Sequence, residues 1–202
     1  MKKEMTIFYE VHDNIYVNLT NKCPCACTFC LRQTRDHMEN SHVLWLEHAP
    51  SFEEVQEAMK AVDFSKYKEV VFCGFGEPTE RLELLCKTAA YLKEQGVRCI
   101  RLNTNGLSDL LHERKTAQDL HGLVDIVSIS LNAGTEEEYQ KVTRPKFPNA
   151  FAALQEFAAD CKNSVPTVMY SVVDVLPKTE LDAAQALADR QGIPLRVRKF
   201  EH

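Results

Sequence analysis

Four cysteines lie close together near the start of the chain, in the stretch CPCACTFC at residues 23–30. The residues before them lack the apolar core of a signal peptide, and no later apolar run is long enough to span a membrane, so we expect a cytoplasmic protein. In a reducing compartment, clustered thiols more often bind metals or react in redox chemistry than form structural disulfides. The remaining cysteines are scattered, and we expect them to be small buried hydrophobic residues: Cys73, Cys86, Cys99 and Cys161.

The spacing of the clustered cysteines distinguishes between the metals that they could bind. Only Cys27 and Cys30 form the CxxC pair typical of structural zinc sites, which also need a second pair of ligands. His37 and His42 could complete such a site only if the following segment folded back onto the loop. The order of the cysteines does not match the bacterial ferredoxin pattern either. Read with Cys23, the pair forms C-x3-C-x2-C, which places three thiols on a short loop directly after a predicted strand.

This pattern resembles the motif of the radical S-adenosylmethionine (SAM) superfamily, C-x3-C-x-aromatic-C, with Phe29 at the aromatic position. The resemblance implies that Cys23, Cys27 and Cys30 bind three irons of a [4Fe-4S] cluster. The fourth iron then has an open coordination position for the amino and carboxylate groups of SAM. Cys25 is separated from each neighbouring ligand by one residue, which makes simultaneous ligation awkward. We therefore expect Cys25 not to bind the cluster.

Later segments resemble the SAM-binding motifs of the same superfamily. CGFGEPTE at 73–80 is similar to the GGEP motif, whose backbone and acidic residue receive the ammonium group of SAM, although Phe75 separates two glycines that are adjacent in many members. RLNTNG at 101–106 and SISLNAG at 128–134 are similar to segments that contact the ribose and methionine groups. EEEYQKVTRP at 136–145 is similar to a segment whose arginine contacts the carboxylate. The residues implied to bind SAM are Gly74, Gly76, Glu77, Pro78, Asn103, Thr104, Ser130, Asn132 and Arg144.

Each of these motifs also has a simpler explanation. Glycine and proline are common in ordinary turns between a strand and a helix, and an arginine at a helix end is often only solvated. The motifs occur in order, however, at the ends of successive predicted strands, which is where barrel enzymes place their active sites. Together they therefore favour a SAM site.

Short runs that are apolar, or in which apolar and polar residues alternate, are followed along the chain by amphipathic segments of helical period. This order predicts a mainly parallel α/β fold. Six strands rich in β-branched and aromatic residues are expected at 14–20, 69–75, 98–104, 125–132, 167–174 and 195–200. Ser51 and Glu54 form a possible capping box before a first helix, and Gly96 and Gly192 are typical helix C-termini. Further helices are expected at 80–95, 109–121, 135–142, 149–162 and 179–191, two of them within the fourth crossover.

Polar residues recur on one face of several predicted strands. A parallel strand between two helical layers should be apolar on both faces, so a shared polar face indicates a barrel with a wet interior. This favours an open partial TIM barrel, (β/α)6, over a doubly wound sheet. We expect one domain over residues 1–202 with its core at 14–200. The polar sets are Tyr16, Asn18 and Thr20; Arg101 and Asn103; Ser128, Ser130 and Asn132; Tyr170 and Asp174; Arg196 and Arg198.

The resemblance implies an enzyme that cleaves SAM reductively to methionine and a 5′-deoxyadenosyl radical, which abstracts hydrogen from a substrate that the sequence does not identify. It also implies an electron donor such as flavodoxin or ferredoxin. With its LWLEHAPSFEEV and GIPLRVRKF segments, the short chain is most similar to the small TatD-associated members. Two alternatives remain open. One is an activase that acts on a partner protein or peptide, and the other is a non-catalytic iron–sulfur or zinc-binding module.

Basic residues on the predicted interior face are candidates for substrate binding. Arg101, Arg196 and Arg198 could attract an anionic substrate, with Asp174 as a polar counterpart, but ion pairs across the barrel would also explain them. Residues 31–51 form a long connection, which we expect to be a lid or a substrate or partner surface that includes Trp45. The formal net charge of −5, from 24 basic and 29 acidic residues, does not indicate a nucleic-acid partner.

Overall fold

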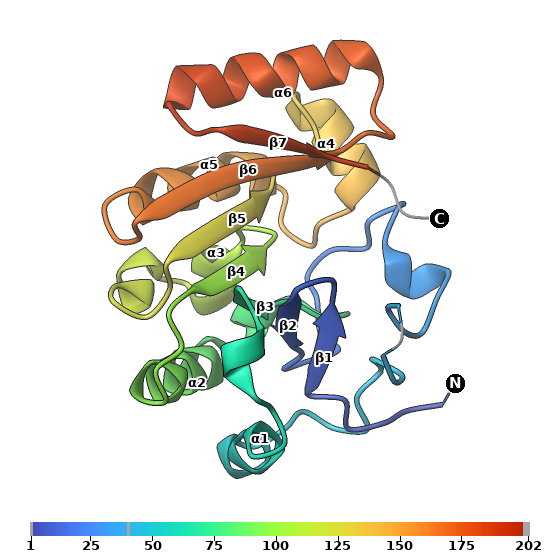
Figure 1. Cartoon of the computed structure of the whole chain (residues 1–202). Helices are drawn as coiled ribbons and strands as arrows, with labels where there is room; N and C mark the ends of the chain where they lie inside the picture. Colours follow the sequence, from blue (N-terminus) through green and yellow to red (C-terminus); the bar gives the residue numbers. More distant parts are fainter. Residues whose placement is uncertain (1, 40, 200–202) are drawn as a thin grey trace.

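The computed structural model describes residues 2–39 and 41–199, which form one curved sheet with helices on its outer side (Figure 1). The strands lie in the order in which they occur in the chain, and every neighbouring pair from β2 onward is parallel. A doubly wound sheet would reverse this order, so that alternative is wrong and the open partial TIM barrel is confirmed. The strands are β1 (Phe8–Val11), β2 (Asn14–Val17), β3 (Val70–Phe72), β4 (Ile100–Thr104), β5 (Ile126–Ser130), β6 (Thr167–Val173) and β7 (Leu195–Arg198).

Helices form the crossovers between the parallel strands. α1 begins at the predicted capping box, in which the Ser51 hydroxyl accepts the N–H of Glu54 at 3.2 Å and the Glu54 carboxylate accepts the N–H of Ser51 at 2.7 Å. As expected, two helices share the crossover from β5 to β6. No helix among the described residues is both long enough and apolar enough to cross a membrane. The helices are α1 (Phe52–Met59), α2 (Leu82–Glu94), α3 (Ser108–His112), α4 (Glu136–Thr143), α5 (Ala150–Cys161) and α6 (Lys178–Gln191).

The sequence prediction omits β1, which pairs antiparallel with β2. This strand has only four residues, and the turn that follows lacks the Asn-Gly or Asp-Gly signature of a tight hairpin. His12 in that turn adopts the left-handed conformation, with φ of 52°. Tyr9 and Tyr16 are cross-strand partners whose ring centroids lie 5.3 Å apart. β1 thus extends the sheet and adds an aromatic side chain beside β2.

The helix expected at 109–121 is interrupted. α3 stops because Glu113 adopts a left-handed conformation with φ of 52°, and a short 3-10 helix, η4 (Ala117–Leu120), follows. Asp109 stabilises the break, since its carboxylate accepts the N–H and the hydroxyl of Thr116 at 2.9 and 2.8 Å. The helix expected from residue 80 likewise begins as a 3-10 turn, η3 (Pro78–Arg81), before α2. Helical structure therefore occurs where it was predicted, but each of the two predicted helices is divided into an α-helix and a 3-10 helix.

The register of the strands separates their side chains into two faces. Val127 and Ile129 point toward the helices and are fully buried. Partners in register share a face, and the pairings place Tyr16, Arg101 and Ser128 together on the concave side. Asn103 and the two β7 arginines lie on the same side. The predicted polar interior face is therefore confirmed for these strands.

Tyr170 lies on the opposite face from the one predicted. It is in register with Ile129 and Leu195, is fully buried, and donates its hydroxyl hydrogen to Gln191 of α6. The error arose because β6 carries apolar residues on both faces. Its sequence pattern therefore does not show which set of alternate side chains faces the barrel interior. Asp174 lies one residue beyond β6 and is exposed.

Candidate functional site

The cysteine loop, residues 20–30, follows β2 and is held from two sides by backbone hydrogen bonds. The N–H groups of Ala26 and Thr28 donate to the carbonyls of Thr143 and Val142 at 3.0 and 2.8 Å. These two carbonyls lie in the last turn of α4. On the other side, the N–H of Glu77 donates to the carbonyl of Lys22 at 2.8 Å. The loop is therefore fixed between the end of α4 and the segment that follows β3.

The thiol of Cys25 lies between those of Cys23 and Cys27. Its hydrogen bonds to both neighbours lower the pKa of Cys23 and of Cys27, and they raise the pKa of Cys25 itself. Burial raises the pKa of the fourth thiol, Cys30. The shifts therefore ease loss of the thiol proton at two of the three expected ligands and oppose it at Cys25.

The geometry of the cysteine loop bears on which metal it suits. Within residues 2–39 and 41–199, no three His, Cys, Asp or Glu side chains converge as ligands of one metal ion. A structural zinc site requires such convergence, whereas thiolates of a [4Fe-4S] cluster bind different irons. His37 and His42 do not approach the cysteines and pair with Asp36 and Glu4. Both histidines are therefore paired with carboxylates outside the cysteine loop.

The glycine loop, residues 74–77, packs directly against the cysteine loop. A Cβ atom on Gly76 would lie 2.3 Å from the carbonyl oxygen of Thr20 and 2.6 Å from that of Lys22. A Cβ atom on Gly74 would lie 2.2 Å from the side-chain oxygen of Asn18. Only glycine permits this close approach of two backbones. Despite the inserted phenylalanine, the two glycines thus bring together both predicted cofactor loops.

Glu77 is buried and joins the ends of β3 and β4. Its carboxylate accepts the N–H and hydroxyl of Thr79 at 3.1 and 2.8 Å, the hydroxyl of Thr104 at 2.7 Å and the N–H of Asn105 at 2.8 Å. Burial raises the pKa of Glu77, and these donors oppose that shift. Four donors occupy most of the accepting capacity of the carboxylate. The backbone of the glycine loop is therefore more available than this side chain to receive an ammonium group. Pro78 follows as the buried first residue of η3.

Polar residues follow β4 and β5 at the same edge of the sheet. Asn132 is buried, adopts φ of 60°, and its side-chain oxygen has no hydrogen-bond partner among the described residues. Such an atom is costly unless a ligand or water satisfies it. Ser130, at the end of β5, is partly exposed. Thr104 also accepts the N–H of Gly106 at 3.1 Å, and Asn103 hydrogen bonds to the Cys73 thiol.

Of two other predicted cofactor residues, Arg144 lies next to the cysteine loop and Phe29 lies within it. Arg144 ends α4 in a left-handed conformation and is exposed, directly after the carbonyls that hold Ala26 and Thr28. Its neighbour Pro145 forms an isolated bridge with Cys25. Phe29 is partly buried and packs against the core. All the predicted cofactor residues thus belong to loops at the C-terminal edge of the sheet or to the strand ends beside them.

Sequence reasoning missed two residues that contact the cysteine loop. The side-chain N–H2 of Asn105 lies 3.9 Å from the sulfur of Cys23 and 3.8 Å from that of Cys25. Arg32 donates to three backbone carbonyls of the two cofactor loops. Asn105 stands within the TNG segment already noted, but only the fold brings it to the sulfurs. Arg32 comes two residues after Cys30, and this short separation was the sequence signal that could have indicated its contact with the cysteine loop.

Arg101 is engaged by a carboxylate on the concave face. Its Nε and Nη2 atoms donate to the two oxygens of Glu69 at 2.7 and 2.8 Å, and the side chains are only 14% and 21% exposed. This two-point contact is the preferred geometry for arginine and carboxylate. The ion pair accounts for Arg101 without a substrate.

Replacing Arg101 with glutamine is expected to lower the free energy of unfolding by about 2 kcal/mol, because Glu69 would lose its partner at a partly buried site. Urea unfolding of the apoprotein measures this change. Lys68→Gln, which breaks an exposed pair with Asp13, serves as the matched control and should leave the unfolding midpoint unchanged. Equal midpoints for the Arg101 and Lys68 variants would contradict the assignment of a structural role to Arg101.

Arg196 and Arg198 differ from Arg101 because neither side chain forms a hydrogen bond or ion pair with the described residues. Both are exposed, and their partners in register place them on the concave face. The positive charges of both arginines act on side chains of other strands. Burial raises the pKa of Tyr16 to about 12, and Arg196 partly offsets that rise. Burial also raises the pKa of Cys73, and Arg198 partly offsets it. Arg196 and Arg198 therefore place two guanidinium groups on the concave face that have no partner among residues 2–39 and 41–199.

The segment 31–51 is anchored at residues 44–46. The side chain of Asn18 donates to the carbonyl of Leu44 at 2.8 Å, and the side chain of Asn21 exchanges two hydrogen bonds with the backbone of Leu46. The Trp45 ring packs edge-on against Phe75 at 5.2 Å, and its buried indole N–H has no partner among the described residues. Residues 44–46 are thus fixed against the segment that follows β2 and against the glycine loop.

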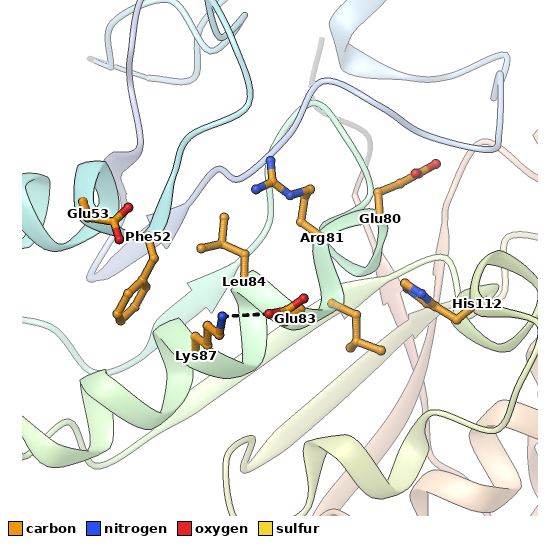
Figure 2. A pocket seen from close by; sticks show the side chains of 9 residues that line it. Phe52, Glu53, Glu80, Arg81, Glu83, Leu84, Lys87 and His112 are labelled. Carbon is orange, nitrogen blue, oxygen red and sulfur yellow. Dashed lines mark ion pairs between the residues drawn. The ribbon is translucent and has the colours of Figure 1, made fainter.

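A surface hollow lies outside the sheet, where α1, η3 and α2 meet (Figure 2). Its lining carries charges of both signs, including an ion pair between Glu83 and Lys87 at 2.7 Å. His112 lines the same hollow and hydrogen bonds to the carbonyl of Thr79 at 2.8 Å. None of the residues predicted to bind cofactor or substrate lines this hollow.

Comparison with protein-family models identifies the family of this chain. A family model described as the radical SAM superfamily matches residues 17–188. A relative from Methanocaldococcus jannaschii, described as "Probable GTP 3',8-cyclase", is 28% identical over 133 residues, or 65% of this chain and 40% of that protein. The FeFe-hydrogenase maturase HydG from Carboxydothermus hydrogenoformans shares the fold, with a TM-score of 0.61 and 20% identity over 94% of this chain and 44% of that one. The chain thus spans less than half the length of either protein.

Proposed function

This chain belongs to the radical SAM superfamily, and from this premise we propose that it is an enzyme that uses a [4Fe-4S] cluster and SAM to abstract hydrogen from an anionic substrate. One observation carries the proposal. The three matched cysteines lie on one loop that packs directly against the glycine loop, with Gly76 in backbone contact at Thr20 and Lys22. The two loops that would hold the cluster and SAM are therefore already assembled.

The residues fit these cofactors in their chemistry. Iron–sulfur clusters are bound by thiolates, and the pKa of Cys23 and of Cys27 is shifted toward that form by hydrogen bonding with Cys25. The unsatisfied side-chain oxygen of Asn132 offers an acceptor to a polar ligand at the same edge of the sheet. When bound, the cluster supplies one electron for cleavage of the sulfonium bond of SAM. The chain's own groups hold the cofactors, orient them and separate them from solvent.

The cofactor residues have separate expected roles. Cys23, Cys27 and Cys30 would bind the cluster, and the glycine-loop backbone would receive the ammonium group of SAM. Exposed Arg144 is available to pair with the SAM carboxylate. The side chain of Asn132 would orient the ribose. Glu77 keeps the ends of β3 and β4 together and so positions this set.

Arg196 and Arg198 support an anionic substrate, because two guanidinium groups that lack a partner among the described residues share one concave face and attract negative charge. Inorganic phosphate serves as the probe, with binding measured by calorimetry. Arg196→Ala and Arg198→Ala are each expected to weaken phosphate binding roughly tenfold. Arg190→Ala, an exposed position on α6, is the matched control. If all three variants bound phosphate as well as the parent, the anionic substrate would be ruled out.

We extend the proposal to the subgroup and the partners. The terminal GIPLRVRKF and the LWLEHAPSFEEV segment support the small TatD-associated members as the nearest subgroup. A soluble one-electron donor such as flavodoxin or ferredoxin would reduce the cluster in the cytoplasm. A partner protein or peptide is the second candidate substrate, which is favoured by the position of β7 at an edge of the sheet, where a strand can pair with another chain.

Anaerobic reconstitution tests the proposed activity. After reduction with dithionite and addition of SAM, the parent should form methionine and 5′-deoxyadenosine in equal amounts when no substrate is present. Formation of 5′-deoxyadenosine requires both the cluster and SAM, so a non-catalytic module would not produce it. A colourless protein that binds only zinc and cannot take up iron would defeat the proposal.

A further inference from the structure

Arg32 joins the cysteine loop to the glycine loop through three backbone carbonyls. Its Nη1 atom lies 3.5 Å from the carbonyl oxygen of Asn21 and 3.3 Å from that of Phe75. Its Nη2 atom lies 3.3 Å from the carbonyl oxygen of Cys25. Asn21 and Cys25 flank Cys23, whereas Phe75 lies between the two glycines of the other loop. One guanidinium group therefore connects both sides of the predicted cofactor site.

The geometry of these contacts requires arginine. A guanidinium carries five N–H donors in a fixed planar arrangement, so it can serve several acceptors at once. A lysine ammonium carries a similar charge but cannot reproduce the same planar set of donors. Two of the three contacts hold segments that are 43 and 11 residues from Arg32 in sequence. The side chain thus links parts of the chain that only the fold brings together.

The charge of Arg32 is not neutralised by a nearby carboxylate. The guanidinium is partly buried, and within the described residues its hydrogen bonds are to carbonyl oxygens alone, none of them to Asp or Glu. Its hydrogen bonds to the carbonyls of Asn21 and Cys25 place the guanidinium beside the part of the cysteine loop that carries Cys23, and Cys30 lies only two residues before it in sequence. Within the described residues, a cation without a carboxylate partner therefore lies against the loop of the expected ligands.

We propose that Arg32 is a positioning residue that clamps the cysteine loop against the glycine loop and, through its charge, raises the reduction potential of the cluster. The inference rests on the proposed function, because it requires that the cysteine loop binds a cluster. Reduction adds one electron from an external donor to the cluster and makes it more negative. A fixed positive charge stabilises that reduced form, since net charge and hydrogen bonding tune such potentials.

Two variants separate the charge from the hydrogen bonds. Arg32→Gln removes both, and its reduced cluster should be disfavoured by roughly tenfold, which corresponds to a midpoint lower by about 59 mV for one electron. Arg32→Lys retains the charge, so its midpoint should fall by less than half as much as that of Arg32→Gln. Because lysine cannot form the same set of hydrogen bonds, this variant should retain less iron than the parent. Arg190→Gln, with the same change in net charge on exposed α6, should match the parent in both measurements.

The measurements are redox titration of the reconstituted protein followed by electron paramagnetic resonance (EPR), and the rate of iron loss to a chelator. A parent-like midpoint and parent-like iron retention in Arg32→Gln would overturn the proposal. So would a lowered midpoint in Arg32→Lys equal to that of Arg32→Gln, because the charge would then have no role. If Arg32→Gln does not fold, as judged by circular dichroism of the apoprotein, the iron retention and midpoint of Arg32→Lys decide the matter.

This test is independent of the proposed enzymatic activity. If the parent binds a cluster but does not cleave SAM, the proposed function fails while the midpoints of the Arg32 variants can still confirm the positioning role. If the parent cleaves SAM and the Arg32 variants match it in midpoint and iron retention, only the inference about Arg32 fails.

Discussion

Replacing Cys27 with alanine is expected to abolish cluster binding and SAM cleavage. Cys27 is the central thiol of the C-x3-C-x2-C pattern, and its lowered pKa favours the thiolate that binds iron. Loss of a direct ligand should reduce cluster retention by more than about 100-fold, the upper range for residues that only support a ligand. Iron analysis, the absorbance of the reconstituted protein and formation of 5′-deoxyadenosine measure the effect.

Cys25→Ala is the matched control for this prediction. Cys25 is buried beside the same ligands, so the substitution removes a thiol from the same loop at nearly the same place. We expect the variant to retain the cluster and SAM cleavage, because Cys25 holds its proton and hydrogen bonds to its neighbours. Retention of the cluster in Cys27→Ala together with its loss in Cys25→Ala would reverse the assignment of the ligands.

The second large effect is expected at Gly76. Its substitution by alanine would place a Cβ atom 2.3 and 2.6 Å from two backbone carbonyl oxygens, those of Thr20 and Lys22, which cannot move without displacing the cysteine loop. Forcing extra volume into such a contact typically costs 1–3 kcal/mol or more, and we expect a loss of about 3 kcal/mol in the free energy of unfolding. Because the displaced loop carries the ligands, iron retention should fall as well. Urea unfolding of the apoprotein and iron analysis measure the two effects.

Gly122→Ala provides a comparison for Gly76→Ala. Gly122 has φ of 71°, but a Cβ atom there would meet nothing within 4 Å. Its substitution should cost only the conformational penalty of about 1 kcal/mol and should leave iron retention unchanged. If Gly76→Ala were no more destabilising than Gly122→Ala and bound iron normally, the close packing of the two loops would be refuted.

The parallel core of the fold was predictable from local patterns. β-branched runs identified β2 to β7, and the capping box at Ser51 and the glycine at position 192 marked helix ends, because each signal lies within a few neighbouring residues. β1 escaped detection because a four-residue strand without a glycine turn carries little local signal. The side that Tyr170 faces also depended on tertiary packing, since β6 is apolar on both faces.

The candidate site was predictable in its motifs but not in its contacts. The spacing of the cysteines and the glycines indicated which segments would contribute. The partners of individual side chains depend on residues far away in sequence: Arg32 reaches Phe75, Arg101 is bound by Glu69, and Glu77 receives donors from beyond β4. Such pairings have no sequence spacing of their own, because the fold alone determines them.

EPR spectroscopy of the reduced cluster, with and without SAM, tests the central claim most directly. We expect SAM to change the spectrum of the parent, because three cysteine ligands would leave one iron open to the cofactor. The same response is predicted for Cys25→Ala. If SAM left the spectrum of the parent unchanged but altered that of Cys25→Ala, the proposed set of three ligands would be wrong, since Cys25 would then bind the fourth iron.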